Sequence, residues 1–187
     1  MTDFVKRFVL KSGFTSDDVD FVSMQRGWIL KQVQKHEAGA YIDVWVTLDR
    51  KTEIHQVDDR PIGTRYLRVH GPGSNDVARH IREDCELWST PEALAELRGA
   101  SAGNEKLTYI YAAALAADEA DGEQVTQEFR KVAADPDAGV RQSLIIATGY
   151  FPYAGLIELV TDLRDSDPVD HVRKNAQLLL DGLSQGK

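Results

Sequence analysis

The sequence predicts two modules: a small α+β domain over residues 1–98 and an all-α array over residues 104–187. Apolar and polar residues alternate between Trp28 and His70, which is the period of half-buried strands. From residue 104 onward, apolar residues recur every three or four positions, as in amphipathic helices. The small residues of segment 99–103 mark the expected boundary between the modules.

The N-terminal segment 3–11 is expected to form a short helix. Its apolar positions lie together on one helical side: Phe4, Val5, Phe8 and Val9. Thr15 then resembles an N-cap that precedes two first-turn acids, so residues 17–25 are expected to form a second helix. The alternation around Phe21 leaves a strand open as the alternative for this segment.

Four strands are expected next, over residues 28–33, 41–48, 52–57 and 65–70. In the clearest of them, Ile42, Val44, Val46 and Leu48 point one way, while Tyr41, Asp43, Trp45 and Thr47 point the other. The connections are short, and a parallel crossover needs a much longer link. The strands are therefore predicted to form a mainly antiparallel sheet.

Two helices are expected after the sheet. Segment 71–74 (Gly-Pro-Gly-Ser) ends the last strand, and a helical stripe follows, made of Val77, Ile81, Cys85 and Trp88. This helix is expected to lie across the apolar face of the sheet. Thr90-Pro91 then opens another helix that runs to about Arg98, because proline fits the first helical turn.

One phrase occurs twice in the C-terminal half. Asp135-Pro136-x-x-x-Val140-Arg141 returns 32 residues later as Asp167-Pro168-x-x-x-Val172-Arg173. In each copy, the aspartate is expected to cap a helix that begins at the proline. The five helices expected in this half span about 104–118, 122–134, 137–149, 153–165 and 168–183.

These phrases resemble HEAT-like helical repeats, in which an Asp-Pro near a helix start is followed by Val-Arg. The resemblance covers roughly 80 C-terminal residues if the fainter unit around Leu107 is counted, and it implies an α-solenoid that binds other proteins. Some relatives of such repeats bind nucleic acid or act as lyases, so the fold does not decide function. We expect Arg141 and Arg173 to bond acidic groups of an adjacent repeat turn, and the alternative is that they bind a ligand.

Composition narrows the class of partner. The formal net charge of −8 argues against binding a nucleic-acid backbone and suits a basic protein partner. Cys85 is the only cysteine, so an internal disulfide and a cysteine-based zinc site are excluded. We find no membrane-length apolar run and no signal pattern, and the expected location is the cytoplasm.

Two surfaces are candidates for binding a partner. The first is the polar face of the sheet, where we expect Tyr41, Asp43, Trp45, Tyr66, Arg68 and His70 to gather. Tyrosine, tryptophan and arginine are enriched among residues that dominate binding energy. The alternative is that this face is merely solvated, or covered by the N-terminal helices.

The second surface is a repeat bend with the helix that follows it. Tyr150, Phe151 and Tyr153 stand at the bend and could anchor a partner, or could equally fill their own hairpin. The following helix is expected to expose three acids: Glu158, Asp162 and Asp165. Such a surface would attract a basic protein.

Catalytic motifs are incomplete. His80 and Asp84 share a helical face, but the sequence has no His-Glu-x-x-His motif and spacing supplies no third ligand, so we predict no metal and no cofactor. We find no Gly-x-Ser-x-Gly elbow, the glycines of segment 71–75 do not form a phosphate-binding motif, and Cys85 is expected to be an inert core thiol.

The first hypothesis is therefore a non-catalytic, cytoplasmic protein-binding module, such as an adaptor, a regulator or an inhibitor. An immunity-type inhibitor of a toxin is one version, which the acidic balance alone supports. The alternative is a small hydrolase-type enzyme on the sheet's polar face, with His55 or His70 as base beside Asp43 or Asp58. A third hypothesis is self-association through a sheet edge.

Overall fold

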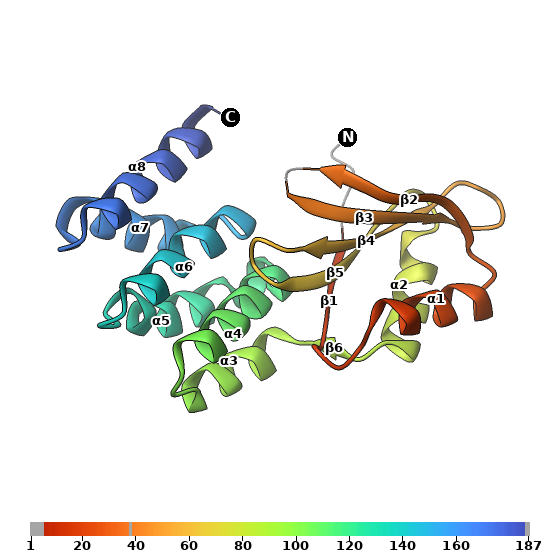
Figure 1. Ribbon diagram of the computed structural model, residues 1–187, viewed down its shortest axis with the longest axis horizontal. Coiled ribbons are helices and arrows are strands. Elements are labelled where there is room, and N and C mark those ends of the chain that lie inside the picture. Colours follow the sequence, from red (N-terminus) through yellow and green to blue (C-terminus); the bar gives the residue numbers. More distant parts are fainter. Residues whose placement is uncertain (1–5, 38, 186–187) are drawn as a thin grey trace. The chain divides into compact units, whose positions relative to one another are not determined.

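The computed structural model describes residues 6–37 and 39–185, and the chain divides into two compact units, Met1–Trp88 and Ser89–Lys187 (Figure 1). Helix α3 (Thr90–Gly99), which the sequence assigned to the first module, belongs to the second unit. It packs against α4 (Gly103–Ala116) through an apolar side that includes the buried Leu94. The small-residue segment 99–103 is thus mainly a turn between two packed helices.

Six antiparallel strands form the sheet of unit 1, in the order β2-β3-β4-β5-β1-β6. Their bounds are β1 (Lys6–Leu10), β2 (Ile29–Glu37), β3 (Ala40–Val46), β4 (Glu53–Asp59), β5 (Thr64–His70) and β6 (Leu87–Trp88). The predicted antiparallel meander is confirmed for β2 to β5. The predicted number of four strands is wrong, because β1 and β6 extend the sheet beyond β5.

Both additional strands were predicted to be helical. Within segment 3–11, the described part is β1, which pairs along β5, while Phe4 and Val5 lie outside the described residues. Trp88 lies in β6 opposite Val9 and is not on the helix that carries Val77 and Ile81. Runs this short do not distinguish strand from helix by their own pattern. Pairing decides here, because β1 pairs with β5 and β6 pairs with β1.

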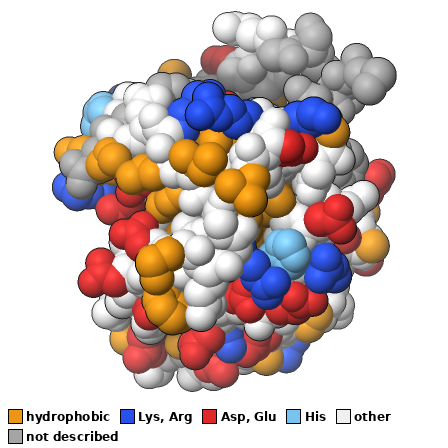
Figure 2. All heavy atoms as spheres, turned by 90° about the vertical axis from the view of Figure 1, so that its right-hand side faces the viewer, with side chains coloured by type: hydrophobic (Ala, Val, Ile, Leu, Met, Phe, Trp, Pro, Cys, Tyr) orange, Lys and Arg blue, Asp and Glu red, His pale blue; other side chains and the backbone are white. Residues whose placement is uncertain are grey.

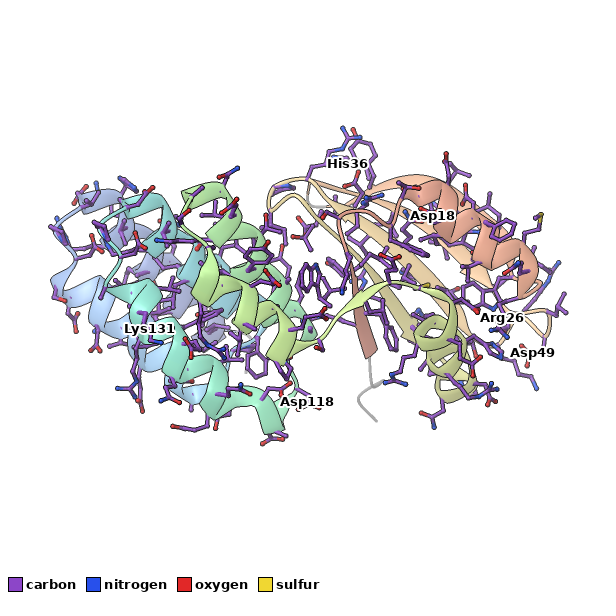
Figure 3. The ribbon with its side chains drawn as sticks, turned by 90° about the horizontal axis from the view of Figure 1, so that it is seen from below. Asp18, Arg26, His36, Asp49, Asp118 and Lys131 are labelled. Atoms are coloured by element: carbon purple, nitrogen blue, oxygen red, sulfur yellow. The ribbon has the colours of Figure 1, made fainter. Side chains whose placement is uncertain are left out.

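Helices α1 (Ser16–Gln25) and α2 (Ser74–Asp84) build the core of unit 1 against one face of the sheet. The core contains Phe8, Leu10, Val19, Val22, Trp28, Trp45, Ile54, Leu67, Val69, Val77, Ala78 and Ile81. The helix predicted after Thr15 is confirmed, and Thr15 and Asp18 form a reciprocal capping box. At the other end of α1, Arg26 (labelled in Figure 3) donates from Nη2 to Asp84 Oδ1 at 2.8 Å. This bond ties α1 to α2.

Six helices make up the described part of unit 2. Besides α3 and α4 they are α5 (Gly122–Ala133), α6 (Ala138–Tyr150), α7 (Ala154–Ser166) and α8 (Asp170–Gln185), with a short 3-10 turn at Glu119–Asp121. The five predicted spans agree with α4 to α8 within two residues at each end. Neighbouring helices pair as α3/α4, α5/α6 and α7/α8, and these pairs contact one another in two layers, α4–α6–α8 and α3–α5–α7.

The aspartates of the repeated phrase, Asp135 and Asp167, do not cap the following helices as predicted. Asp137 caps α6, while Asp135 accepts the Asp137 N–H at 2.9 Å; Asp167 likewise accepts the Val169 N–H at 2.8 Å. Each aspartate thus closes a turn two residues ahead of itself. Its second task is to bind a cation from an earlier helix, as Asp135 does with the ammonium of Lys106 at 2.7 Å.

The most buried of these ion pairs joins Arg141 of α6 to Asp167. Arg141 donates from Nε at 2.6 Å and from Nη2 at 3.0 Å to the two carboxylate oxygens, and its Nη1 donates to the Asp135 and Pro136 carbonyls. The side chains are 8% and 0% exposed. The expectation that Arg141 bonds an acidic group of the next turn is confirmed. Arg173 instead donates to the Asp167 carbonyl and to Asp170.

We expect Arg141→Met to lower the free energy of unfolding by about 3–5 kcal/mol, because it leaves the Asp167 carboxylate buried without its partner. The matched change Arg173→Met removes the other phrase arginine, whose side chain is 38% exposed in its pair with Asp170, and we expect it to cost about 1 kcal/mol or less. Urea unfolding followed by circular dichroism measures both. Equal costs would contradict the assigned role of Arg141.

Acid should weaken this connection. Hydrogen bonding from Arg141 holds the pKa of Asp167 below its ordinary value of 3.8. The unfolded chain therefore binds a proton at Asp167 before the folded chain does, so stability falls as the pH drops below 3.8 and through the folded pKa. We expect Asp167→Asn to be less stable at neutral pH but to show a flatter pH dependence, measured by urea unfolding between about pH 2 and 5.

Candidate functional site

The register of the sheet separates the residues predicted to share one polar face. Asp43 of β3 lies opposite Gln56 of β4, which lies opposite Leu67 of β5. Tyr41, Asp43 and Trp45 therefore lie on the face covered by α1 and α2, whereas Tyr66, Arg68 and His70 lie on the other. The prediction of a single patch is wrong.

Individual residues of that prediction have other roles. Trp45 is 3% exposed and belongs to the core, so it does not offer a binding surface in this structure. Tyr41 is half-buried and its ring carries the Arg60 guanidinium at 4.1 Å. The Nε of Arg68 is buried and has no hydrogen-bond partner among the described residues.

The second predicted surface comprises the bend at residues 150–153 and the acidic helix that follows it, and the three acids of that helix are exposed as predicted. Glu158, Asp162 and Asp165 are exposed at i, i+4 and i+7 on α7, which is one side of the helix. Tyr150 and Phe151 are half-buried, and Phe151 stacks on Tyr153 with ring centroids 5.8 Å apart.

The Tyr153 side chain packs inside unit 2 against a neighbouring helix. Its ring lies so close to the backbone of Gly122 that a Cβ there would stand 2.2 Å from the ring. The ring thus packs against the start of α5, the helix of the preceding pair. For Tyr153, the structure favours the alternative of internal packing over that of an exposed anchor.

A cluster that the sequence did not predict as a group lies on the face of the β4–β5 ladder opposite to α1 and α2. Glu53 and His55 are two residues apart on β4, and His70 lies directly opposite Glu53 on β5. The carboxylate oxygen Oε2 of Glu53 is 2.9 Å from Nε2 of His55 and 3.2 Å from Nε2 of His70. The two imidazole rings meet edge to face at 5.1 Å.

Hydrogen bonds and burial shift the pKa values of two members of this cluster, Glu53 and His55. Hydrogen bonds from Lys31 and His55 lower the pKa of Glu53 to about 2, so this carboxylate is ionised at neutral pH. Burial lowers the pKa of His55, and the nearby Arg68 and His70 act in the same direction. The side chains of Glu53, His55 and His70 are 25%, 20% and 36% exposed, so small solutes can reach them.

The carboxylates that the sequence predicted beside the histidines, Asp43 and Asp58, are wrong. Asp43 and Asp58 lie on the helix-covered face, opposite to His55 and His70, and Glu53 is the acid beside both histidines. The sequence signal was Glu53-x-His55 on a strand, but only the register with β5 adds His70. Cys85 behaves as predicted for an inert thiol, since burial raises its pKa to about 12.

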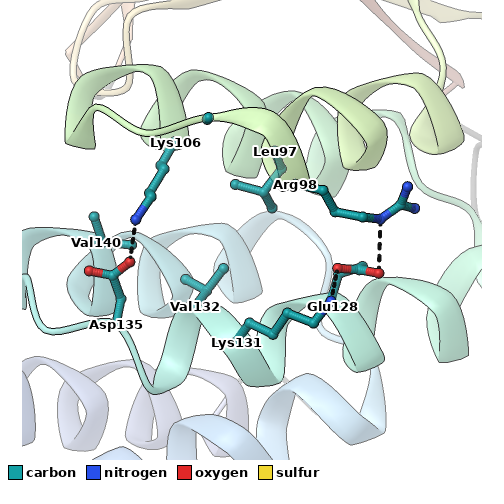
Figure 4. Close-up of a pocket in the computed structure, with 9 residues that line it drawn as sticks. Leu97, Arg98, Lys106, Glu128, Lys131, Val132, Asp135 and Val140 are labelled. Carbon is teal, nitrogen blue, oxygen red and sulfur yellow. Dashed lines mark hydrogen bonds and ion pairs between the residues drawn. The ribbon is translucent and has the colours of Figure 1, made fainter.

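The grooves between the helices of unit 2 contain charges that are already paired. A cavity of about 340 Å³ lies between Leu97, Val132 and Val140 (Figure 4). Lys106 pairs with Asp135 across it at 2.7 Å, and Glu128 pairs with Arg98 and Lys131, each at 3.0 Å. A ligand would have to break these pairs, so we assign the groove to packing between helix pairs.

Exposed apolar side chains of α1, β2 and the β3–β4 turn make up an apolar surface of unit 1, and Figure 2 shows apolar side chains gathered on one face of the molecule. We call this apolar surface of unit 1 the edge surface, and its exposed members are Phe21, Met24, Ile29, Leu30, Val33 and Leu48. Phe21 and Met24 are one turn apart on α1, and Leu48 lies over Gly27, which joins α1 to β2. Exposed apolar clusters of this kind mark sites of interaction more often than isolated apolar residues do.

No family model, curated protein or solved structure matches this chain. Across residues 6–37 and 39–185, every helix is too short or too polar to span a membrane.

The close packing of Tyr153 on Gly122 can be tested by adding one methyl group. Alanine is normally favoured over glycine in a helix, but we expect Gly122→Ala to destabilise the protein by about 1–3 kcal/mol because the Tyr153 ring must move. Gly182→Ala in α8 meets nothing within 4 Å and should stabilise it by about 0.5–1 kcal/mol. Thermal unfolding compares the two variants, and stabilisation by both would refute the packing role.

Proposed function

We propose that this chain is a non-catalytic, cytoplasmic protein-binding module: an adaptor, a regulator or an inhibitor of the immunity type. In this proposal, unit 2 is a HEAT-like α-solenoid that serves as a scaffold, and a protein partner docks on the edge surface of unit 1. The observation that carries the proposal is the concentration of exposed apolar side chains around the unpaired edge of β2.

The edge surface combines two requirements for binding a protein segment. Leu30 and Val33 are 50% and 61% exposed, so they offer apolar area to a partner. Strand β2 is outermost in the sheet, and among the described residues no strand pairs with its outer side. Its free backbone N–H and C=O groups can therefore accept an added strand, with specificity from alternate side chains.

We commit to a strand from a different protein as the occupant of this edge. An unpaired strand edge is a template for strand addition, and the exposed apolar residues of β2 offer contact area to an added strand. The charge balance indicates the chemistry of that partner. Residues 89–187 hold 16 Asp and Glu against nine Lys and Arg, a net of −7, while residues 1–88 hold 14 against 13, a net of −1.

The acidic excess thus belongs to the helical unit, and it favours a basic partner. On α7, Glu158 and Asp162 are exposed, and among the described residues neither forms an ion pair. These carboxylates would steer a basic protein and make its association sensitive to salt. The same charge supports the earlier expectation that nucleic acid is not the partner.

A hydrolase-type enzyme is the second candidate, favoured by the contacts of Glu53 with His55 and His70. A general base, such as a histidine or a carboxylate, must lie within hydrogen-bond reach of the proton that it removes. This cluster supplies a carboxylate within hydrogen-bond reach of two histidines. The cluster contributes nothing to the protein-binding proposal, so the two functions can be tested separately.

The test begins with capture of the tagged protein's partners from a lysate of its own host, at low and moderate salt, followed by mass spectrometry and titration calorimetry with the purified partner. We expect one stoichiometric protein whose affinity falls as salt rises. Leu30→Ser with Val33→Ser should weaken it at least about tenfold, or about 1.4 kcal/mol, because the apolar contact is lost. Leu178→Ser, at a residue of α8 that is 67% exposed, is the matched control and should change little.

Charge reversal separates the contribution of α7 from that of overall charge. Glu158→Lys with Asp162→Lys should reduce the association rate and flatten its salt dependence. Glu96→Lys with Glu123→Lys makes the same change in net charge at exposed positions of α3 and α5 and should have a smaller effect. Absence of any partner, or equal binding by all variants, would overturn the proposal. A second copy of this chain as the captured species would replace it with self-association.

A further inference from the structure

We propose that Glu53, His55 and His70 form a binding site for a divalent transition-metal ion of the zinc class. The three residues offer two imidazole nitrogens and one carboxylate oxygen, and these donor atoms all lie within 4.8 Å of one another. The inference concerns unit 1 alone and is independent of the protein-binding function proposed above.

The sheet holds the three donors on a rigid frame. Glu53 and His55 point to the same side of β4 because they are two residues apart, and His70 is the direct cross-strand neighbour of Glu53. Sites built on strands keep their geometry better than sites built on loops. The donors are therefore arranged by the same backbone ladder that forms the sheet.

The distances are close to those that a tetrahedral ion requires. Zinc binds histidine nitrogen and carboxylate oxygen at about 2.0–2.2 Å, which places neighbouring ligand atoms about 3.3 Å apart. Glu53 Oε2 stands 2.9 Å and 3.2 Å from the two Nε2 atoms. An ion can thus enter with small rotations of the side chains.

The donor set selects the kind of metal. Two imidazoles with a carboxylate suit zinc, cobalt, nickel or iron, whereas calcium and magnesium prefer ligand sets made wholly of oxygen. Three protein ligands leave a fourth tetrahedral position for water, and the His70 side chain is 36% exposed. Such an arrangement is typical of reactive rather than structural zinc sites.

A neighbouring lysine determines which carboxylate oxygen of Glu53 faces the histidines. Lys31 pairs with Oε1 of Glu53 and so orients the second oxygen, Oε2, toward the two histidines. Its positive charge also competes with an ion at that oxygen, so we expect Lys31 to weaken metal binding.

The test uses the full chain, freed of its purification tag and of metal, and titrated with cobalt(II) chloride. One equivalent of Co²⁺ should give the visible absorption bands of a four-coordinate ion, and Zn²⁺ should abolish them by displacement. Calorimetry with ZnCl₂ should give one site per chain. Zinc should also raise the melting temperature of the protein.

Variants then locate the site. His55→Gln and His70→Gln should each weaken Zn²⁺ binding at least about tenfold and remove the Co²⁺ bands. His80→Gln, in α2, is the matched control and should leave both unchanged. Lys31→Gln should tighten binding several-fold, an outcome that a purely structural hydrogen-bond cluster does not produce.

Two results would overturn the proposal: absence of cobalt bands and of zinc heat in the folded wild-type protein at millimolar metal, or binding that survives in His70→Gln. Circular dichroism of each variant shows whether it has folded. Glu53→Gln provides a second route, because it keeps the size of the side chain while removing the charge. Partner capture plays no part in these measurements, so their failure leaves the protein-binding proposal standing.

Discussion

The antiparallel ladder in which β4 pairs with β3 and β5 is the constraint on which unit 1 depends. Its register places Trp45, Ile54 and Val69 side by side under the two helices, and it places Glu53, His55 and His70 together on the other side. A shift of one residue would exchange the two sets between the two faces of the sheet. The apolar core therefore stabilises the arrangement of the ionisable cluster.

In unit 2 a comparable role falls to the aspartates of the repeated phrase. Asp135 and Asp167 each close a turn through a backbone N–H and bind a cation from an earlier helix, Lys106 in one case and Arg141 in the other. A buried carboxylate is costly unless it is paired, so each connection tolerates little change. One short phrase thereby specifies both the turn before the second helix of a pair and the contact of that pair with the preceding one.

The two units distribute their surface chemistry differently. Exposed apolar side chains gather around β2 in unit 1, while the excess of negative charge belongs to unit 2. The cations of unit 2 that line the described groove are engaged in internal pairs, whereas the acids Glu158 and Asp162 on α7 are exposed. An apolar contact for affinity and an acidic surface for steering are complementary requirements of protein binding.

The sequence by itself determined the antiparallel meander β2–β5, the helices α4–α8, the capped start of α1 and the exposure of the acids on α7. These features follow from local periodicity and turn chemistry, which a single segment carries. Only the tertiary structure decided that β1 and β6 are strands, that α3 joins the helical unit, and that Trp45 is core. It also decided that His70 stands beside Glu53. Each of these depends on pairing or packing between segments distant in sequence, and local pattern does not encode such partners.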